Sequence, residues 1–119
     1  MDQDTYDRGM AMRRKVHGDA NVDDFTRDFQ RLATQYDWGE IWGDPTLTPR
    51  ERSILNLGML AALGKMHEFE THCRGALTNG LTPNEIRAVL TQVAVYCGFP
   101  VGVDCFRVAR KVINKAQAT

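Results

Sequence analysis

The sequence predicts an all-α fold built as a single compact domain of five or six helices. Apolar residues recur at helical spacing through most of the chain, and no stretch shows the alternation of a half-buried strand. Two similar helix-start motifs, and glycines that follow apolar runs, divide the chain into segments of helical length. The 119 residues match the usual size of one domain, and no low-complexity linker interrupts them. We therefore expect one domain over residues 1–119.

The first third of the chain predicts two helices and then a turn. Residues 6–16 are amphipathic and end at Gly18. A second helix is expected to follow Asn21 or Asp23, since either side chain can cap a first turn. The apolar face of that helix consists of Phe25, Phe29, Leu32 and Tyr36. Two glycines and a proline within residues 38–45 predict a turn or a broken helix there.

Two sharper start signals organise the rest of the chain. Thr48 and Thr82 each precede a proline and a glutamate at the third helical position, which is the pattern of a capping box with proline in the first turn. The helix over residues 49–63 is apolar on almost all sides after its first turn and stops at Gly64, so we expect it at the buried centre. Further helices are expected over residues 65–79, 83–97 and 101–116.

Composition narrows the possible functions of the protein and its expected place in the cell. Lys+Arg and Asp+Glu both number 15, a balance that disfavours nucleic-acid binding. The longest nearly apolar run, residues 57–64, is too short to span a bilayer, and the acidic N-terminus lacks the apolar core of a signal peptide. Three cysteines without paired spacing predict free thiols in a reducing cytoplasm: Cys73, Cys97 and Cys105.

Glu68 and His72 form a candidate acid–base pair on the helix expected over residues 65–79. They lie four residues apart and share one face at the edge of the apolar stripe. A carboxylate beside an imidazole fixes the tautomer of the ring and raises its pKa, which suits proton transfer near neutral pH. The same spacing also occurs in pairs that only stabilise an exposed helix, so both interpretations stay open.

Trp38 and Trp42 are the candidate aromatic residues of a binding site. They lie four residues apart and flank Glu40 in a glycine-rich stretch. Such a pair either walls a pocket for a flat ring or packs within a core or a subunit interface. The spacing alone is compatible with both arrangements.

Arginines supply the candidate anion-binding groups. Arg50 and Arg52 open the helix of residues 49–63, where a cation is poorly placed for the helix dipole and can instead grip a carboxylate. Arg13 and Arg14 are alternatives for an anion or a neighbouring subunit. Zinc-protease, phosphate-loop and nucleophile-elbow motifs do not occur. We therefore expect no metal and no cofactor, so an enzyme here would work by acid–base and electrostatic means.

Taken together, these motifs resemble the 4-carboxymuconolactone decarboxylases, a family within the alkylhydroperoxidase D-like superfamily. The resemblance covers nearly the whole chain. It includes a Trp-Gly-x-x-Trp segment, a Tyr-Cys-Gly-x-Pro segment and the helical histidine, His72. The matching stretches are residues 9–19, 38–42, 52–53, 72–86 and 95–98.

The resemblance implies an alkylhydroperoxidase D-like helical fold that assembles as a homo-oligomer, typically a hexamer. It also implies cofactor-independent conversion of 4-carboxymuconolactone to 3-oxoadipate enol-lactone, in the protocatechuate branch of the beta-ketoadipate pathway. Redox members of the superfamily carry two cysteines where this chain has Lys65 and Glu68. Two further departures are Cys73 and Asp44, which stand where an aliphatic and a basic residue are expected.

Roles follow for the candidate residues if the resemblance holds. His72 would donate a proton or a hydrogen bond to the developing dienolate, and Glu68 would orient its ring. Arg52 would hold a carboxylate of the substrate. The pocket would be lined by Trp38, Glu40 and Trp42.

Two alternatives from other classes remain open. The first is a superfamily member with peroxidase or thiol redox activity through Cys73 or Cys97. The second is a non-enzymatic helical binding module, because residues 80–85 between two helices superficially suggest a helix-turn-helix. Zero net charge speaks against DNA as the partner of such a module.

Overall fold

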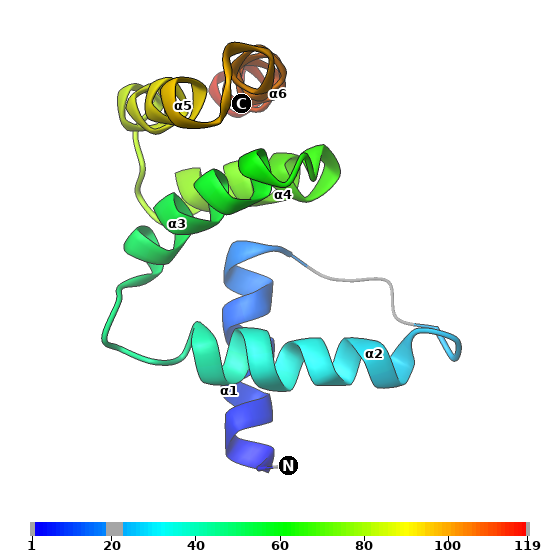
Figure 1. Cartoon of the computed structure of the whole chain (residues 1–119). Helices are drawn as coiled ribbons and strands as arrows, with labels where there is room; N and C mark the ends of the chain where they lie inside the picture. The colour runs from blue at the N-terminus through cyan, green and yellow to red at the C-terminus, as the bar shows by residue number, and fades with distance from the viewer. Residues whose placement is uncertain (1, 19–22, 119) are drawn as a thin grey trace. The chain divides into compact units, whose positions relative to one another are not determined.

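The computed structural model describes residues 2–18 and 23–118, and the predicted all-α class is confirmed because those residues form helices and no strand. They fall into two compact units, Met1–Pro49 and Arg50–Thr119. None of their helices is long and apolar enough to cross a membrane. The elements are α1 (Gln3–Val16), α2 (Arg27–Leu32), the π-helix η1 (Ala33–Ile41), α3 (Pro49–Ala62), α4 (Met66–Thr78), α5 (Pro83–Cys97) and α6 (Phe99–Gln117) (Figure 1).

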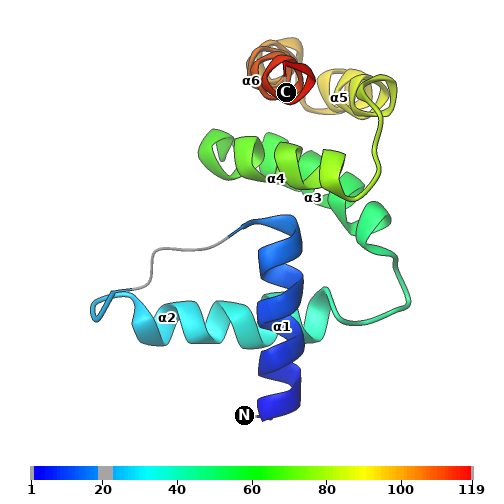
Figure 2. The ribbon, with the colours of Figure 1, turned by 180° about the vertical axis from the view of Figure 1, so that it is seen from behind.

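In the first unit, α1 lies across η1, as views from both sides show (Figure 1 and Figure 2). Two glycines make this crossing possible. A Cβ atom on Gly9 would lie 2.2 Å from the carbonyl oxygen of Thr34, and one on Gly39 would lie 2.5 Å from the carbonyl oxygen of Thr5. Because the two backbones touch at this point, any side chain at either glycine would push the helices apart.

The predicted turn or broken helix at residues 38–45 is wrong for its first half. The helical backbone runs on from α2 through η1 to Ile41, and turns occupy only residues 42–47. The Trp42 amide donates to the carbonyl of Asp37 at 2.9 Å, the five-residue step of a π-helix. Gly39 therefore serves the close approach to α1 instead of ending a helix.

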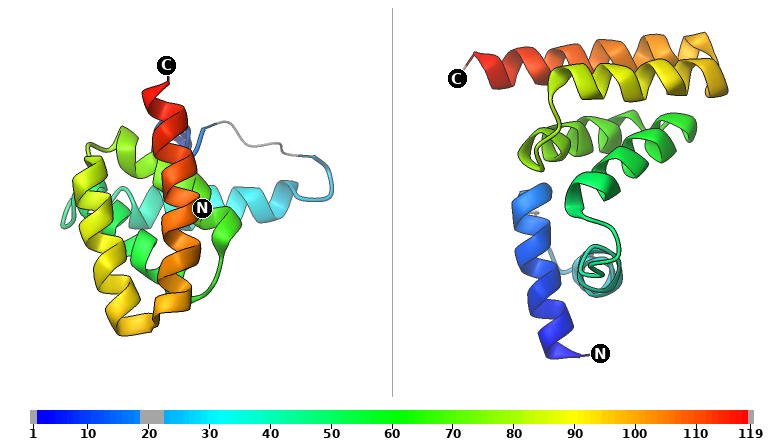
Figure 3. Two further views of the ribbon diagram at one scale, coloured as in Figure 1. Left: turned by 90° about the horizontal axis from the view of Figure 1, so that it is seen from above. Right: turned by 90° about the vertical axis from the view of Figure 1, so that its left-hand side faces the viewer.

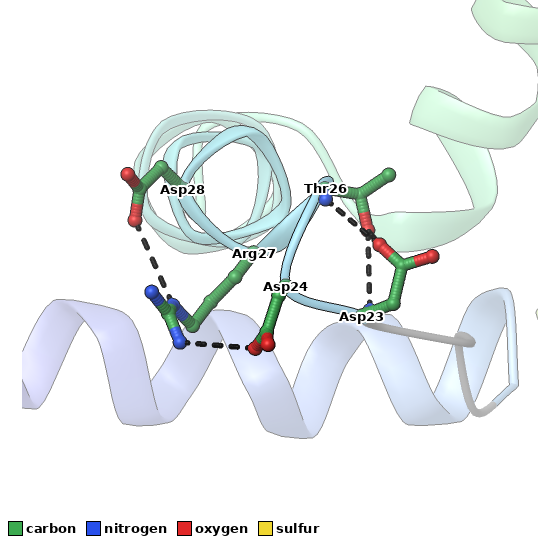
Figure 4. A network of polar contacts seen from close by, with 5 residues as sticks. All are labelled: Asp23, Asp24, Thr26, Arg27 and Asp28. Atoms are coloured by element: carbon green, nitrogen blue, oxygen red, sulfur yellow. Dashed lines mark hydrogen bonds and ion pairs between the residues drawn. The ribbon is translucent and has the colours of Figure 1, made fainter.

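A reciprocal hydrogen-bond pair precedes α2 (Figure 4). The Asp23 carboxylate accepts from the Thr26 amide at 2.8 Å, and the Thr26 hydroxyl accepts from the Asp23 amide at 3.3 Å. Arg27 then contacts the carboxylates of Asp24 and Asp28 at 3.3 and 3.9 Å, at an exposed site where such pairs contribute little to stability. The prediction that Asp23 caps this helix is wrong, because α2 begins at Arg27 with Thr26 as its N-cap and Asp23 instead holds the turn before it. Asn21 lies outside the described residues.

The apolar stripe of this segment is not covered within the chain. Phe25 and Phe29 are 96% and 68% exposed, and Leu32 and Tyr36 are about half exposed. The predicted apolar face is therefore helical from Phe29 onward and exposed to solvent, and Phe25 lies in the turn before α2.

The second unit has two layers of two helices, with the α5–α6 pair over the α3–α4 pair (Figure 3, right). Its core takes a fully buried side chain from each helix: Leu57, Phe69, Leu90 and Cys105. α6 begins at Phe99, two residues before the predicted start, because Gly98 alone makes the turn from α5 with a φ of 115°. Such a left-handed φ favours glycine, and Pro100 fits the first turn of α6.

The prediction that the helix after Thr48 forms the buried centre is wrong. α3 starts at Pro49 as expected, but only one face of it is buried, through Ser53, Leu57 and Ala61. Leu55 and Met59 on its other sides are 51% and 46% exposed. In a two-layer arrangement a helix packs by one face, so an all-round apolar sequence leaves apolar side chains in solvent.

The second capping box is confirmed in full. The Thr82 hydroxyl accepts from the Glu85 amide at 3.1 Å, and the Glu85 carboxylate accepts from the Thr82 amide at 3.0 Å. The remaining carboxylate oxygen of Glu85 pairs with Arg50. The starts of α3 and α5 are thereby joined.

We predict that Gly39→Ala lowers the free energy of unfolding by about 1–3 kcal/mol, the usual cost of forcing a methyl group into a packed contact. Gly58→Ala is the control, because a Cβ atom there meets nothing within 4 Å and alanine favours the helix. Urea unfolding of both variants measures the difference. Equal stability of Gly39→Ala and the wild-type protein would contradict the close crossing of α1 and η1.

Candidate functional site

Two side-chain contacts join α3 to α4 and to the C-cap residue of α4, Asn79. The Nδ2 atom of Asn56 lies 3.4 Å from the Nδ1 atom of His72, and Nδ2 of Asn79 donates to the hydroxyl of Ser53 at 2.9 Å. We call these four residues the polar seam. Ser53 is fully buried and the other three are half-buried. The seam brings His72 into contact with a residue of the neighbouring helix.

Arg52 lies next to this seam. It precedes Asn56 by four residues on α3, so the two share one face of that helix. The side chain is half-buried, and its Nε atom is inaccessible to water. A guanidinium group in such a place is less screened than one on an open surface, which strengthens its attraction for an anion. Of the predicted site residues, His72 therefore belongs to the seam and Arg52 lies one helical turn from Asn56.

Glu68 lies one helical turn before His72 and is exposed to solvent. The neighbour that the structure places at Nδ1 of His72 is Asn56, which the sequence analysis did not identify. A signal for it was present, since Asn56 is the only polar side chain within residues 54–63. The role of Glu68 in orienting the ring stays a prediction.

Two of the alternative arginines have structural partners that belong to the helices around them. Arg50 is held by Glu85 at the start of α5. Arg13 is buried in the first unit, where its guanidinium donates to the Thr34 hydroxyl at 2.9 Å and to the Gln30 side chain. Both side chains thus tie helices together. The assignment of Arg52 to a substrate carboxylate stays a prediction.

The two tryptophans belong to the first unit and pack on each other. Their ring centroids are 5.1 Å apart, and His17 meets Trp38 edge-on at 6.0 Å. Trp38 and Trp42 are only 5% and 3% exposed, while Glu40 between them is exposed. This packing agrees with the core interpretation of the pair. Their place in a substrate pocket, and that of Glu40, stays a prediction.

The cysteines differ in exposure. Cys73 and Cys105 are fully buried in the core of the second unit, whereas Cys97 is exposed. Burial raises the pKa of the Cys73 and Cys105 thiols to about 11, because the apolar surroundings disfavour the thiolate. Neither buried thiol suits nucleophilic or redox chemistry near neutral pH.

Among the grooves that the described part of the second unit forms are four of about 410–530 Å³. Their lining residues do not include Arg52 or the seam. The largest runs between α5 and α6, with Phe99, Val103 and Phe106 among its apolar residues and Arg110 at its edge. Within residues 2–18 and 23–118, no three His, Cys, Asp or Glu side chains gather as a metal site requires.

Comparison with known proteins places the chain in a family. The carboxymuconolactone decarboxylase family model matches residues 27–111. A nitrosuccinic acid decarboxylase of Metarhizium robertsii is 37% identical over 116 residues, covering 92% of this chain and 81% of the relative. A 4-carboxymuconolactone decarboxylase of Acinetobacter baylyi is 30% identical over 120 residues, covering 95% and 90%. The chain therefore belongs to the carboxymuconolactone decarboxylase family.

Proposed function

We propose that this protein is a cofactor-independent carboxy-lyase that converts 4-carboxymuconolactone to 3-oxoadipate enol-lactone. Both relatives named above are decarboxylases, which supports this class of reaction. The observation that carries the proposal is the placement of Arg52 beside the contact between Asn56 and His72. That cluster combines a cation for a carboxylate with an imidazole for a proton or a hydrogen bond.

The chemistry of the lactone explains why such a cluster is sufficient. The departing carboxylate sits on a ring carbon that is conjugated through a C=C bond to the lactone carbonyl. When CO₂ leaves, the electron pair of the broken C–C bond moves along that path and forms a dienolate on the carbonyl oxygen. Protonation of the carbon next to the carbonyl then completes the reaction. The ring is its own electron sink, so the protein supplies positioning, oxyanion stabilisation and a proton.

The residues divide this work by their chemistry. Arg52 would hold the carboxylate that stays with the product, since a planar guanidinium binds a carboxylate through two hydrogen bonds. His72 would stabilise the dienolate oxygen or deliver the proton, with Glu68 one turn away on the same helix. For Trp38, Glu40 and Trp42 we keep the role that the family resemblance implies, which is contact with the substrate. Apolar surroundings favour loss of CO₂, because the departing carboxylate loses its charge as it leaves.

Nitrosuccinic acid is the second candidate substrate, and the relative that is 37% identical favours it. This acid also carries two carboxylates, and its nitro group can take up the electron pair as a nitronate when CO₂ leaves. The same cation and the same proton donor would serve both substrates. The two candidate substrates therefore require pockets of different shape but the same type of chemistry.

Turnover of the two acids by the purified protein tests the proposal. After dialysis against EDTA, we expect CO₂ release from 4-carboxymuconolactone with loss of its ring absorbance, and a smaller kcat/KM for nitrosuccinate. A larger kcat/KM for nitrosuccinate than for the lactone would instead identify nitrosuccinate as the substrate. A rate that depends on added metal would refute the cofactor-free mechanism.

We further propose that the protein works as a homo-oligomer, with a hexamer favoured. Apolar side chains stay exposed on both units, including Phe25 and Phe29 on one and Leu55 and Leu63 on the other. Apolar surface of this kind is typical of a subunit interface. A chain of 119 residues also has little interior in which to enclose a pocket, so an interface is a natural place for one.

His72→Ala should lower kcat by roughly 10²–10⁴-fold, the usual contribution of a positioned acid or base, with little effect on the melting temperature. His67→Ala is the matched control, because His67 is exposed on the same helix. His72→Gln separates two roles, since glutamine donates a hydrogen bond but does not exchange a proton. Glu68→Gln should be milder than His72→Ala. A normal kcat in folded His72→Ala would remove His72 from the mechanism.

Arg52→Ala should raise KM roughly 10- to 100-fold, as expected for loss of a charge-assisted hydrogen bond, and Arg52→Lys should recover only part of the loss. Arg50→Ala is the control. It removes a half-exposed ion pair with Glu85, so it should lower stability by about 1 kcal/mol or less and leave KM unchanged. Steady-state kinetics of the three variants decide the point. Normal KM values for both Arg52 variants would show that Arg52 does not bind the substrate, and another arginine would then have to do so.

The cysteines allow a test of the thiol redox alternative. With a pKa of about 11, roughly one in a thousand of the Cys73 and Cys105 thiols is ionised at pH 8. Iodoacetamide should therefore label Cys97 in the native protein and all three cysteines in urea, as read by mass spectrometry. Activity should survive labelling of Cys97. Fast labelling of native Cys73, or loss of activity with Cys97, would favour thiol chemistry.

A further inference from the structure

Asn56 stands out in its helix. Among residues 54–63 it alone has a polar side chain, and it is half-buried. Asparagine is unfavourable inside a helix, and a polar group removed from water costs free energy unless it is hydrogen-bonded. A polar residue at this position therefore needs a partner, and its Nδ2 atom lies 3.4 Å from Nδ1 of His72.

We propose that Asn56 is a positioning residue that determines which ring nitrogen of His72 carries the proton. The inference rests on the proposed function only in its consequence for catalysis. An amide N–H that donates to Nδ1 requires that nitrogen to be unprotonated. The neutral ring then carries its proton on Nε2, and Nε2 becomes the nitrogen that donates.

The choice of partner also bears on the charge of the ring. A carboxylate at Nδ1 would favour the imidazolium form, whereas a neutral amide does not. Asn56 belongs to α3 and Glu68 to α4, so the two side chains reach His72 from different helices. With Asn56 at Nδ1, the Nε2–H group of the neutral ring is the donor that the inference assigns to the substrate. Such a group stabilises a developing oxyanion by a hydrogen bond, which makes this the main role of His72.

The position of Arg52 fits that role. It shares a face of α3 with Asn56, so the cation and the residue that orients the imidazole rise from consecutive turns of one helix. A carboxylate held by Arg52 and an oxyanion held by His72 would then belong to the same small substrate. Asn56 itself acts through the ring and need not touch the substrate.

Nitrogen NMR of the imidazole tests the inference without any substrate. The chain has three histidines, so the His72 resonances are assigned by their loss in His72→Gln. In the neutral wild-type ring we expect an unprotonated Nδ1 and a protonated Nε2. Asn56→Asp has nearly the same size but offers only acceptors, so it should move a proton onto Nδ1. Ser53→Ala breaks the other contact of the seam and should leave the His72 nitrogens unchanged.

Two results would overturn the inference. One is a protonated Nδ1 in the neutral wild-type ring, which would mean that Asn56 accepts from His72. The other is an unprotonated Nδ1 in Asn56→Asp, because a contact that controls the ring must respond to this change. Asn56→Asp is close in shape to the native side chain, so the comparison does not depend on a variant with a large cavity.

Kinetics then link the tautomer to catalysis. Asn56→Leu should lower kcat about tenfold with little change in KM, because it removes a hydrogen bond that positions a catalytic group. In the His72→Gln background the same change should have almost no further effect, since the residue acts through the ring. Full additivity of the two substitutions would contradict the positioning role. If the wild-type protein turned over neither acid, the proposed function would fail while the NMR result still decided the inference.

Discussion

Polar side chains removed from water need partners, and Asn56 and Ser53 of α3 meet this constraint with two contacts. Asn56 reaches His72, and Asn79 reaches Ser53. Loss of either partner would leave a buried or half-buried polar group without its hydrogen bond, which is costly in apolar surroundings. The candidate site thus consists of groups whose pairing also joins α3 to α4 and to the C-cap residue of α4. Arg52, one turn from Asn56, adds a cation to the same region.

Other contacts of the second unit hold this region in place. The capping box of Thr82 and Glu85 starts α5, and the spare oxygen of Glu85 binds Arg50 two residues before Arg52. Arg50 and Arg52 therefore have separate tasks despite their proximity in sequence. Arg50 secures the start of α3 to that of α5, while Arg52 is the residue that the proposal assigns to the substrate. In the first unit, Gly9 and Gly39 play a comparable structural part by letting α1 and η1 touch.

The sequence predicted most elements because caps, glycines and helical periodicity are local signals. The start of α5 at Thr82 is an example, since its capping box depends on four consecutive residues. The nature of η1 was not predictable in this way. In the sequence, Gly39 looks like a helix breaker. The structure shows that a glycine is needed there because Thr5 and Gly9 of another helix approach its backbone closely. Contacts between distant segments are absent from any local pattern.

Burial was predicted less well than helicity for the same reason. The sequence of α3 is apolar on nearly all sides, yet Leu55 is half exposed because the chain supplies neighbours on one side only. For the site, Glu68 was selected because it lies one turn from His72 on the same helix. Asn56 was missed because its contact crosses between helices, although its isolation in an apolar stretch was a usable signal.

The most direct test of the central claim is an NMR titration of the protein with succinate, a dicarboxylate that lacks the electron sink for decarboxylation. If Arg52 and the seam bind the substrate, resonances of the Arg52 Nε–H group, the Asn56 amide and the His72 ring should shift together and saturate. Those shifts should disappear in Arg52→Ala. Shifts confined to Arg110 and the groove between α5 and α6, with Arg52 and His72 unaffected, would contradict the account.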